Sequence, residues 1–137
     1  MWEYRDAAVD KAVDDNLRGT FNSGRAGVKA VGGRGEGGVL INVASGTALR
    51  GNQNFAYPTA KGGVIALTNS QATMLGRHNI RANVIVPVFV SQAPPSLCQS
   101  PEILNTRPLF FPVGRPGVFS GLAPLPAFLP PSPLPRL

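Results

Sequence analysis

Apolar residues recur at a spacing close to 3.6 through the first thirty residues of the chain, and Asp10 and Asp14 fall on the other face. This period predicts a helix over residues 7–31, and Asp6 is placed to cap its N-terminus. The glycine-rich run at 32–38 predicts its end. The apolar positions that define the pattern are Val9, Ala12, Val13, Leu17, Phe21, Val28 and Val31.

The pattern changes after the glycine run. Residues 38–44 are almost continuously apolar, which is typical of a buried parallel strand. A loop is expected over 45–55, followed by a second helix over 57–76. Residues 79–86 are predicted to form a second buried strand, which Pro87 ends.

The order helix, strand, helix, strand predicts an α/β fold with a parallel sheet and right-handed crossovers. Two parallel strands make a poor sheet, so the pattern indicates part of a larger doubly wound, Rossmann-like fold. Thirteen of the fourteen prolines lie at or after Pro87. We therefore expect a partial Rossmann-like segment over 1–91 and a proline-rich, irregular or disordered tail over 92–137.

Charge and composition exclude several classes of function. The net charge of +6 comes from arginines scattered along the chain, which does not indicate a nucleic-acid surface. Residues 116–135 are apolar, but their seven prolines argue against a membrane span. The single cysteine, Cys98, and the single histidine, His78, exclude a disulfide framework and a multi-cysteine or histidine-rich metal site. Together with a first segment that lacks an apolar signal, these features favour a cytoplasmic protein without a metal.

The sequence at 33–38 matches the dinucleotide pattern G-x-G-x-x-G. That pattern binds pyrophosphate only when it follows a strand and opens a helix. Here it follows a helix and precedes a strand, so it predicts a helix stop and a turn instead.

Three residues could carry chemistry. Tyr57 and Lys61 are spaced i, i+4, which places both side chains on one face of the second helix. An ammonium close to a phenol stabilises the phenolate, so the pair suits proton transfer at a carbonyl or alcohol. Ser45 follows the first strand, at the strand end where open α/β sheets form their sites. Taken alone, Tyr-x-x-x-Lys also fits an exposed tyrosine beside a solvated lysine.

Four segments together resemble the C-terminal half of a short-chain dehydrogenase/reductase. They are Asn16-Leu-Arg-Gly-Thr-Phe, Ile41-Asn-Val-Ala-Ser45, Tyr57-Pro-Thr-Ala-Lys61-Gly-Gly and Ile80-Arg-Ala-Asn-Val-Ile-Val-Pro87. The resemblance implies hydride transfer between NAD or NADP and a carbonyl or alcohol substrate. In that family the residue matching Tyr57 is the general acid/base, and the residue matching Lys61 binds the nicotinamide ribose.

The resemblance implies further roles. Ser45 would orient the substrate oxygen, and Asn16 would hold a water that relays protons to Lys61. A local bond inside the helix is the alternative for Asn16. Pro87 and Val90 would contact the cofactor. The two long helices would form a subunit interface, in a homo-oligomer or with a full-length relative.

The family's glycine-rich phosphate loop has no counterpart in this sequence, and Val88 stands where the family usually has glycine. We therefore expect cofactor binding to be weakened or lost. The alternative function is a truncated, non-catalytic relative that associates with a full-length partner through its two long helices.

Overall fold

The computed structural model describes residues 4–32, 37–91 and 117–128. The chain forms two compact units, a first unit that extends to Val88 and a second unit over Phe89–Leu129.

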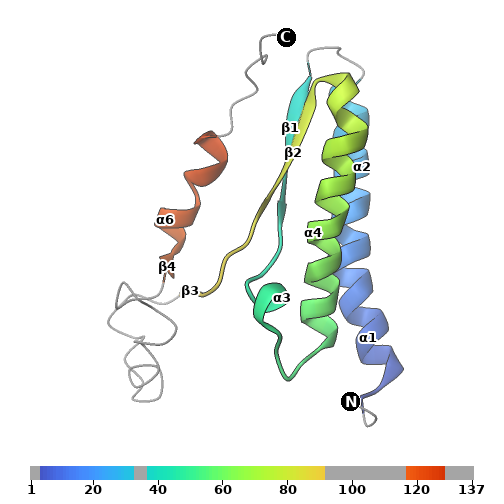
Figure 1. Cartoon of the computed structure of the whole chain (residues 1–137), viewed down its shortest axis with the longest axis vertical. Coiled ribbons are helices and arrows are strands. Elements are labelled where there is room, and N and C mark those ends of the chain that lie inside the picture. The colour runs from blue at the N-terminus through green and yellow to red at the C-terminus, as the bar shows by residue number, and fades with distance from the viewer. Residues whose placement is uncertain (1–3, 33–36, 92–116, 129–137) are drawn as a thin grey trace. The chain divides into compact units, whose positions relative to one another are not determined.

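The first unit begins with one long run of helix (Figure 1). It consists of α1 (Asp6–Ala12), the π-helical segment η1 (Val13–Arg18) and α2 (Gly19–Gly32). The predicted helix is therefore present, but the prediction that Asp6 caps it is wrong. Arg5 holds the cap position, and the Ala8 N–H already bonds the Arg5 carbonyl at 2.9 Å. Asp6 lies inside the first turn, where a carboxylate is favoured by the helix dipole.

Two parallel strands follow the predicted positions. Strand β1 spans Gly38–Val43, and β2 spans Ile80–Ile85. Their register runs from Gly38 opposite Ile80 to Val43 opposite Ile85. The expected α/β order with a parallel pair is confirmed.

Helix α4 (Ala56–Leu75) connects the two strands, and the short 3₁₀ turn η2 (Gly76–His78) follows it. The predicted loop over 45–55 is partly helical, because Thr47–Arg50 form the single turn α3. The Ala48 and Leu49 N–H groups close this turn on the carbonyls of Ser45 and Gly46.

Both long helices lie on one face of the strand pair (Figure 1). Leu40 and Asn42 point toward them: Leu40 lies next to Gly24 of α2, and Asn42 bonds side chains of α4. Because side chains alternate along a strand, Val43 points to the opposite face, where 49% of it is exposed. Among the described residues no helix is both long and apolar enough to cross a membrane.

The core of the first unit lies between β1, β2 and α4. Its buried apolar members are small, and Val64 of α4 is fully buried. They are Ala44, Ala56, Ala60, Val64 and Ile80. Glycine lets the helices approach closely, since a Cβ on Gly63 would lie 2.8 Å from Cδ2 of Leu17 in η1.

The second unit contains two short parallel strands, β3 (Val90–Ser91) and β4 (Gly117–Val118). Helix α6 (Phe119–Leu122) and the 3₁₀ turn η4 (Leu125–Phe128) follow. Most of the predicted irregular tail, including Cys98, lies outside the described residues.

Candidate active site

Tyr57 and Lys61 lie one turn apart on α4, and both are half-buried. The Lys61 Nζ atom lies 5.8 Å from the centroid of the Tyr57 ring. It also donates a hydrogen bond of 3.0 Å to the Val43 carbonyl at the end of β1. The i, i+4 spacing therefore brings the ammonium over the phenol ring, and β1 holds it there.

Ser45 is buried just beyond the end of β1, with 9% of its surface exposed. Its Oγ accepts a hydrogen bond of 3.0 Å from the Thr47 hydroxyl and a longer one of 3.4 Å from the Thr47 N–H. A hydroxyl that accepts two bonds can still donate its own proton. Ser45 can therefore donate to a substrate oxygen. Sequence reasoning missed Thr47, although a hydroxyl two residues after a serine is a recognisable turn signal.

The loops that follow β1 and β2 meet at Gly46 and Pro87. The Gly46 N–H bonds the Pro87 carbonyl at 2.7 Å. A Cβ on Gly46 would lie 2.9 Å from Cγ2 of Val88 and 3.0 Å from its Cα. This close approach places Ser45 next to the loop that carries Pro87.

Substituting alanine for Gly46 tests the close contact between Gly46 and Val88. Gly46→Ala is expected to destabilise the first unit by about 1–3 kcal/mol, because the new Cβ meets the Val88 backbone, which cannot rotate away. Gly62→Ala on α4 is the matched control, since a Cβ there meets nothing within 4 Å. It should stabilise the chain by roughly 0.5–1 kcal/mol through helix propensity. Urea unfolding followed by circular dichroism measures both, and equal midpoints for the two variants would contradict the expectation.

Asn16 lies in the π-helical segment and is half-buried. Its Nδ2 donates to the Ala12 carbonyl at 3.0 Å, and its own backbone carbonyl accepts the Thr20 hydroxyl at 2.6 Å. The Gly19 N–H bonds the Asp14 carbonyl, five residues back, which widens the helix at this point. The Asn16 side chain therefore makes a local bond inside the helix, which was the alternative to a water-holding role. This bond lies in the irregular, π-helical turn.

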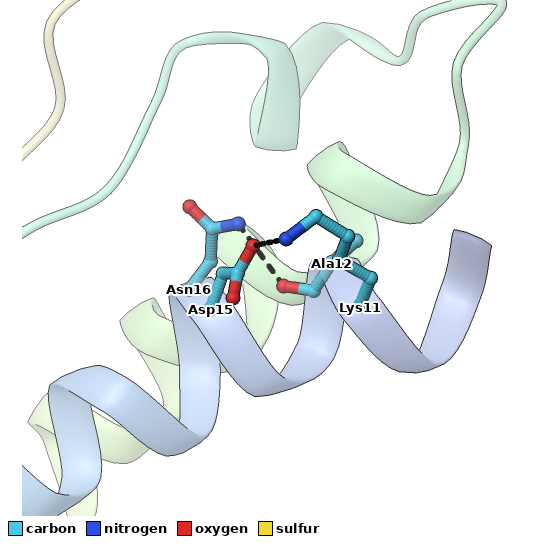
Figure 2. Close-up of polar contacts among 4 residues, drawn as sticks. All are labelled: Lys11, Ala12, Asp15 and Asn16. Carbon is cyan, nitrogen blue, oxygen red and sulfur yellow. Dashed lines mark hydrogen bonds and ion pairs between the residues drawn. The ribbon is translucent and has the colours of Figure 1, made fainter. Parts of the chain in front are cut away.

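Figure 2 shows this local bond beside an ion pair on the surface of the same helix. Lys11 and Asp15 lie 2.8 Å apart, and the hydrogen bond and charge of Asp15 raise the pKa of Lys11 above its usual 10.5. Both side chains are well exposed, so the pair adds little to stability.

The end of the glycine run lies away from this site. A Cβ on Gly37, whose φ is +75°, would lie 2.4 Å from the Asn79 carbonyl oxygen, and Gly38 stands opposite Ile80. These contacts occur at the amino ends of β1 and β2, whereas Ser45 and Pro87 follow their carboxyl ends. Gly37 and Gly38 therefore act as a turn between helix and strand, and residues 33–36 lie outside the described residues.

Two further residues named in the sequence analysis lie outside this arrangement. His78, for which no site role was predicted, is exposed in η2 and accepts a 3.1 Å bond from Arg77 Nε. Val90 belongs to the second unit, where it pairs with Gly117.

Sequence reasoning also missed a buried polar cluster behind the site. The Asn42 amide nitrogen donates to the Thr68 hydroxyl at 2.8 Å and to Gln71 Oε1 at 2.7 Å. Asn42 and Thr68 are only 5% and 3% exposed. The only sequence signal was a polar residue inside an otherwise apolar strand.

Comparison with known proteins agrees with this arrangement of helices and strands. Residues 1–95 match the family model for short chain dehydrogenases. Estradiol 17-beta-dehydrogenase 8 of Callithrix jacchus is 36% identical over 122 residues, which cover 88% of this chain and 90% of that sequence. The (3R)-3-hydroxyacyl-CoA dehydrogenase of Rattus norvegicus is 35% identical over the same share of this chain, but that share covers only 46% of the rat protein.

Solved structures are similar as well. An acetoin dehydrogenase of Salmonella typhimurium superposes with a TM-score of 0.81 at 25% identity, covering 94% of this chain and 50% of that one. The chain therefore spans about half the length of the rat (3R)-3-hydroxyacyl-CoA dehydrogenase and of the Salmonella acetoin dehydrogenase.

The fold is that of a Rossmann-like α/β oxidoreductase segment. The chain belongs to the short-chain dehydrogenase/reductase family.

Proposed function

We propose that these residues form the catalytic segment of a nicotinamide-dependent oxidoreductase that interconverts an alcohol and a carbonyl. The observation that carries the proposal is the position of the Lys61 ammonium, over the Tyr57 ring and bonded to the Val43 carbonyl. In this proposal Tyr57 exchanges a proton with the substrate oxygen, and Ser45 donates a hydrogen bond to the same oxygen.

The donor groups fit the ribose part of a nicotinamide cofactor. An ammonium has three protons, and the Val43 carbonyl takes one from Lys61. Two protons remain for sugar hydroxyls, and the Tyr57 phenol lies beside them. Pro87 is proposed as a further cofactor contact, and the role that the family resemblance implies for Val90 stays a prediction. When bound, the nicotinamide supplies or accepts the hydride; an uncharacterised NAD-dependent oxidoreductase of Mycobacterium tuberculosis, 36% identical over 91 residues, supports such a cofactor.

The described residues offer no comparable set of donors for the pyrophosphate part of the cofactor. Gly37 and Gly38 precede a strand, so they present no helix N-terminus to a phosphate. We therefore expect weak nucleotide binding by this chain.

Asn16 is proposed to assist through its backbone. Its carbonyl lies in the widened turn and already accepts one bond from Thr20, and a carbonyl oxygen has a second lone pair for a water. Such a water would connect the helix to Lys61.

The substrate is proposed to be a secondary alcohol or the matching ketone. The names of the relatives denote dehydrogenases of estradiol, of (3R)-3-hydroxyacyl-CoA and of acetoin, and each of these molecules carries a hydroxyl group. Acetoin and a (3R)-3-hydroxyacyl-CoA are therefore the first two probes, one small and one large.

Nucleotide binding by the purified chain tests the proposal. NADH and NADPH fluorescence should show saturable binding that Lys61→Ala weakens by about tenfold, as expected for the loss of a charged hydrogen bond. Lys29→Ala is the matched control, because Lys29 is exposed on α2. Wild-type binding that Lys61→Ala leaves unchanged would contradict the proposed site.

We further propose that the chain associates with a second copy or a relative through its long helices. Phe21 of α2 and Met74 of α4 support this, since 45% and 66% of their respective surfaces are exposed. Sedimentation velocity on the same preparation would detect self-association, and a monomer at all concentrations would exclude it; the same measurement on a mixture with a full-length relative tests the other pairing.

A further inference from the structure

A buried hydrogen-bond network joins β1 to α4 behind the candidate site. The Asn42 amide donates both of its protons, one to the Thr68 hydroxyl at 2.8 Å and one to Gln71 Oε1 at 2.7 Å. The Thr68 hydroxyl in turn donates a hydrogen bond of 2.7 Å to the Val64 carbonyl. The side-chain donors of Asn42 and Thr68 are therefore satisfied, and each of these bonds has a fixed direction.

The same network reaches the first long helix. Gly24 of α2 is buried, and a Cβ on it would lie 2.9 Å from Nε2 of Gln71. The absence of a side chain at Gly24 leaves room for Gln71 to turn its oxygen toward Asn42. Strand β1 and helices α2 and α4 therefore meet at one set of polar contacts.

These three elements carry the proposed catalytic residues. Ser45 follows β1, Tyr57 and Lys61 lie on α4, and Asn16 lies on the helix that continues into α2. Val43, whose carbonyl holds Lys61, is joined directly to Asn42. Both residues belong to β1, whose φ and ψ angles are confined to the extended region, so fixing the Asn42 side chain against α4 also restricts where the Val43 carbonyl lies.

We propose that Asn42, through Thr68 and Gln71, is a positioning residue that sets β1 against α4 so that the Val43 carbonyl holds Lys61 beside Tyr57. The assignment of catalysis to Tyr57 and Lys61 rests on the proposed function, whereas the position of Lys61 can be measured independently. An apolar residue at 42 would fill the space but would leave β1 free to slide against the helix. Buried polar contacts of this kind specify one arrangement among several packed ones.

Two substitutions at Thr68 separate hydrogen bonding from packing. Thr68→Val keeps the volume and removes the hydroxyl, whereas Thr68→Ser keeps the hydroxyl and removes a methyl group. If the network positions Lys61, the valine variant frees the Lys61 amine from its wild-type position and the serine variant does not. If Thr68 matters only for packing, the serine variant disturbs Lys61 more than the valine variant does. Thr73→Val is the matched control, because Thr73 is exposed on the same helix and its hydroxyl bonds only Asn69 of α4.

The readout is the reactivity of the Lys61 amine. The chain has three lysines, so reductive methylation with peptide mass spectrometry measures Lys61 against Lys11 and Lys29 in one sample. In the wild-type chain Lys61 should react more slowly than the exposed Lys29. Thr68→Val should raise the Lys61 rate about tenfold, the effect of losing one buried hydrogen bond, and should leave Lys29 unchanged.

The proposal is wrong if Thr68→Val leaves the Lys61 rate at its wild-type value, or if Thr68→Ser raises it as much. A rise at all three lysines would indicate general unfolding and would also contradict it. If Thr68→Val does not fold, Gln71→Met removes the second acceptor at a half-buried position and carries the same test. Nucleotide titration of the variants is the separate arm: absent binding by the wild-type chain would overturn the proposed function alone, since the methylation result stands without a nucleotide.

Discussion

Tyr57→Phe is expected to lower kcat for the alcohol and ketone probes by about 10²–10⁴-fold, the contribution of a positioned general acid/base. The phenylalanine ring keeps the contact with Lys61 and removes only the hydroxyl that exchanges the proton. Nucleotide affinity should therefore change much less than kcat. The reaction is followed through the absorbance of the reduced nicotinamide, with acetoin and a (3R)-3-hydroxyacyl-CoA as substrates.

Tyr4→Phe is the matched control for this variant, because the chain has two tyrosines. The Tyr4 hydroxyl donates to Asn54 Oδ1, and its ring packs against Phe55 at a tilt of 50° with centroids 4.3 Å apart. Losing that hydroxyl should leave kcat close to the wild-type value. Turnover that survives Tyr57→Phe would remove Tyr57 from the acid/base role. A wild-type chain without turnover would contradict the proposed activity for these 137 residues alone.

Val64→Ala is expected to destabilise the first unit by about 2–3 kcal/mol. Val64 is fully buried, and the substitution removes two methyl groups at roughly 0.8 kcal/mol each and leaves a cavity. The neighbouring core residues Ala56 and Ala60 are too small to fill the space. The midpoint of urea unfolding should fall by about 1 M, given the m-values of small proteins.

Val31→Ala on α2 makes the same chemical change at a valine that is 37% exposed. Val64 lies inside α4 and Val31 lies one residue before the end of α2, so Val64→Ala gains at least as much helix propensity as Val31→Ala. A lower unfolding midpoint for Val64→Ala therefore reports the loss of buried surface. Val31→Ala should lie within about 0.5 kcal/mol of the wild-type chain. Equal losses in the two variants would mean that the small core around Val64 does not hold this unit together.

Local pattern alone was sufficient to find the main elements of the first unit. The two predicted strands became β1 and β2, and the helical period before the glycine run became the segment that ends at Gly32. These predictions succeeded because the period of side-chain burial is a property of the backbone geometry. The same reasoning failed at Asp6 and at Thr47–Arg50, where single turns depend on one or two backbone bonds.

The sequence by itself determined which residues could do chemistry and the order of the secondary structure around them. The spacing of Tyr57 and Lys61 already required one helix face. Only the tertiary structure decided that Lys61 bonds the Val43 carbonyl and that Asn42 reaches across to Thr68. These contacts join β1 to residues up to 26 positions away, and their geometry depends on how a strand packs against a helix rather than on any local period.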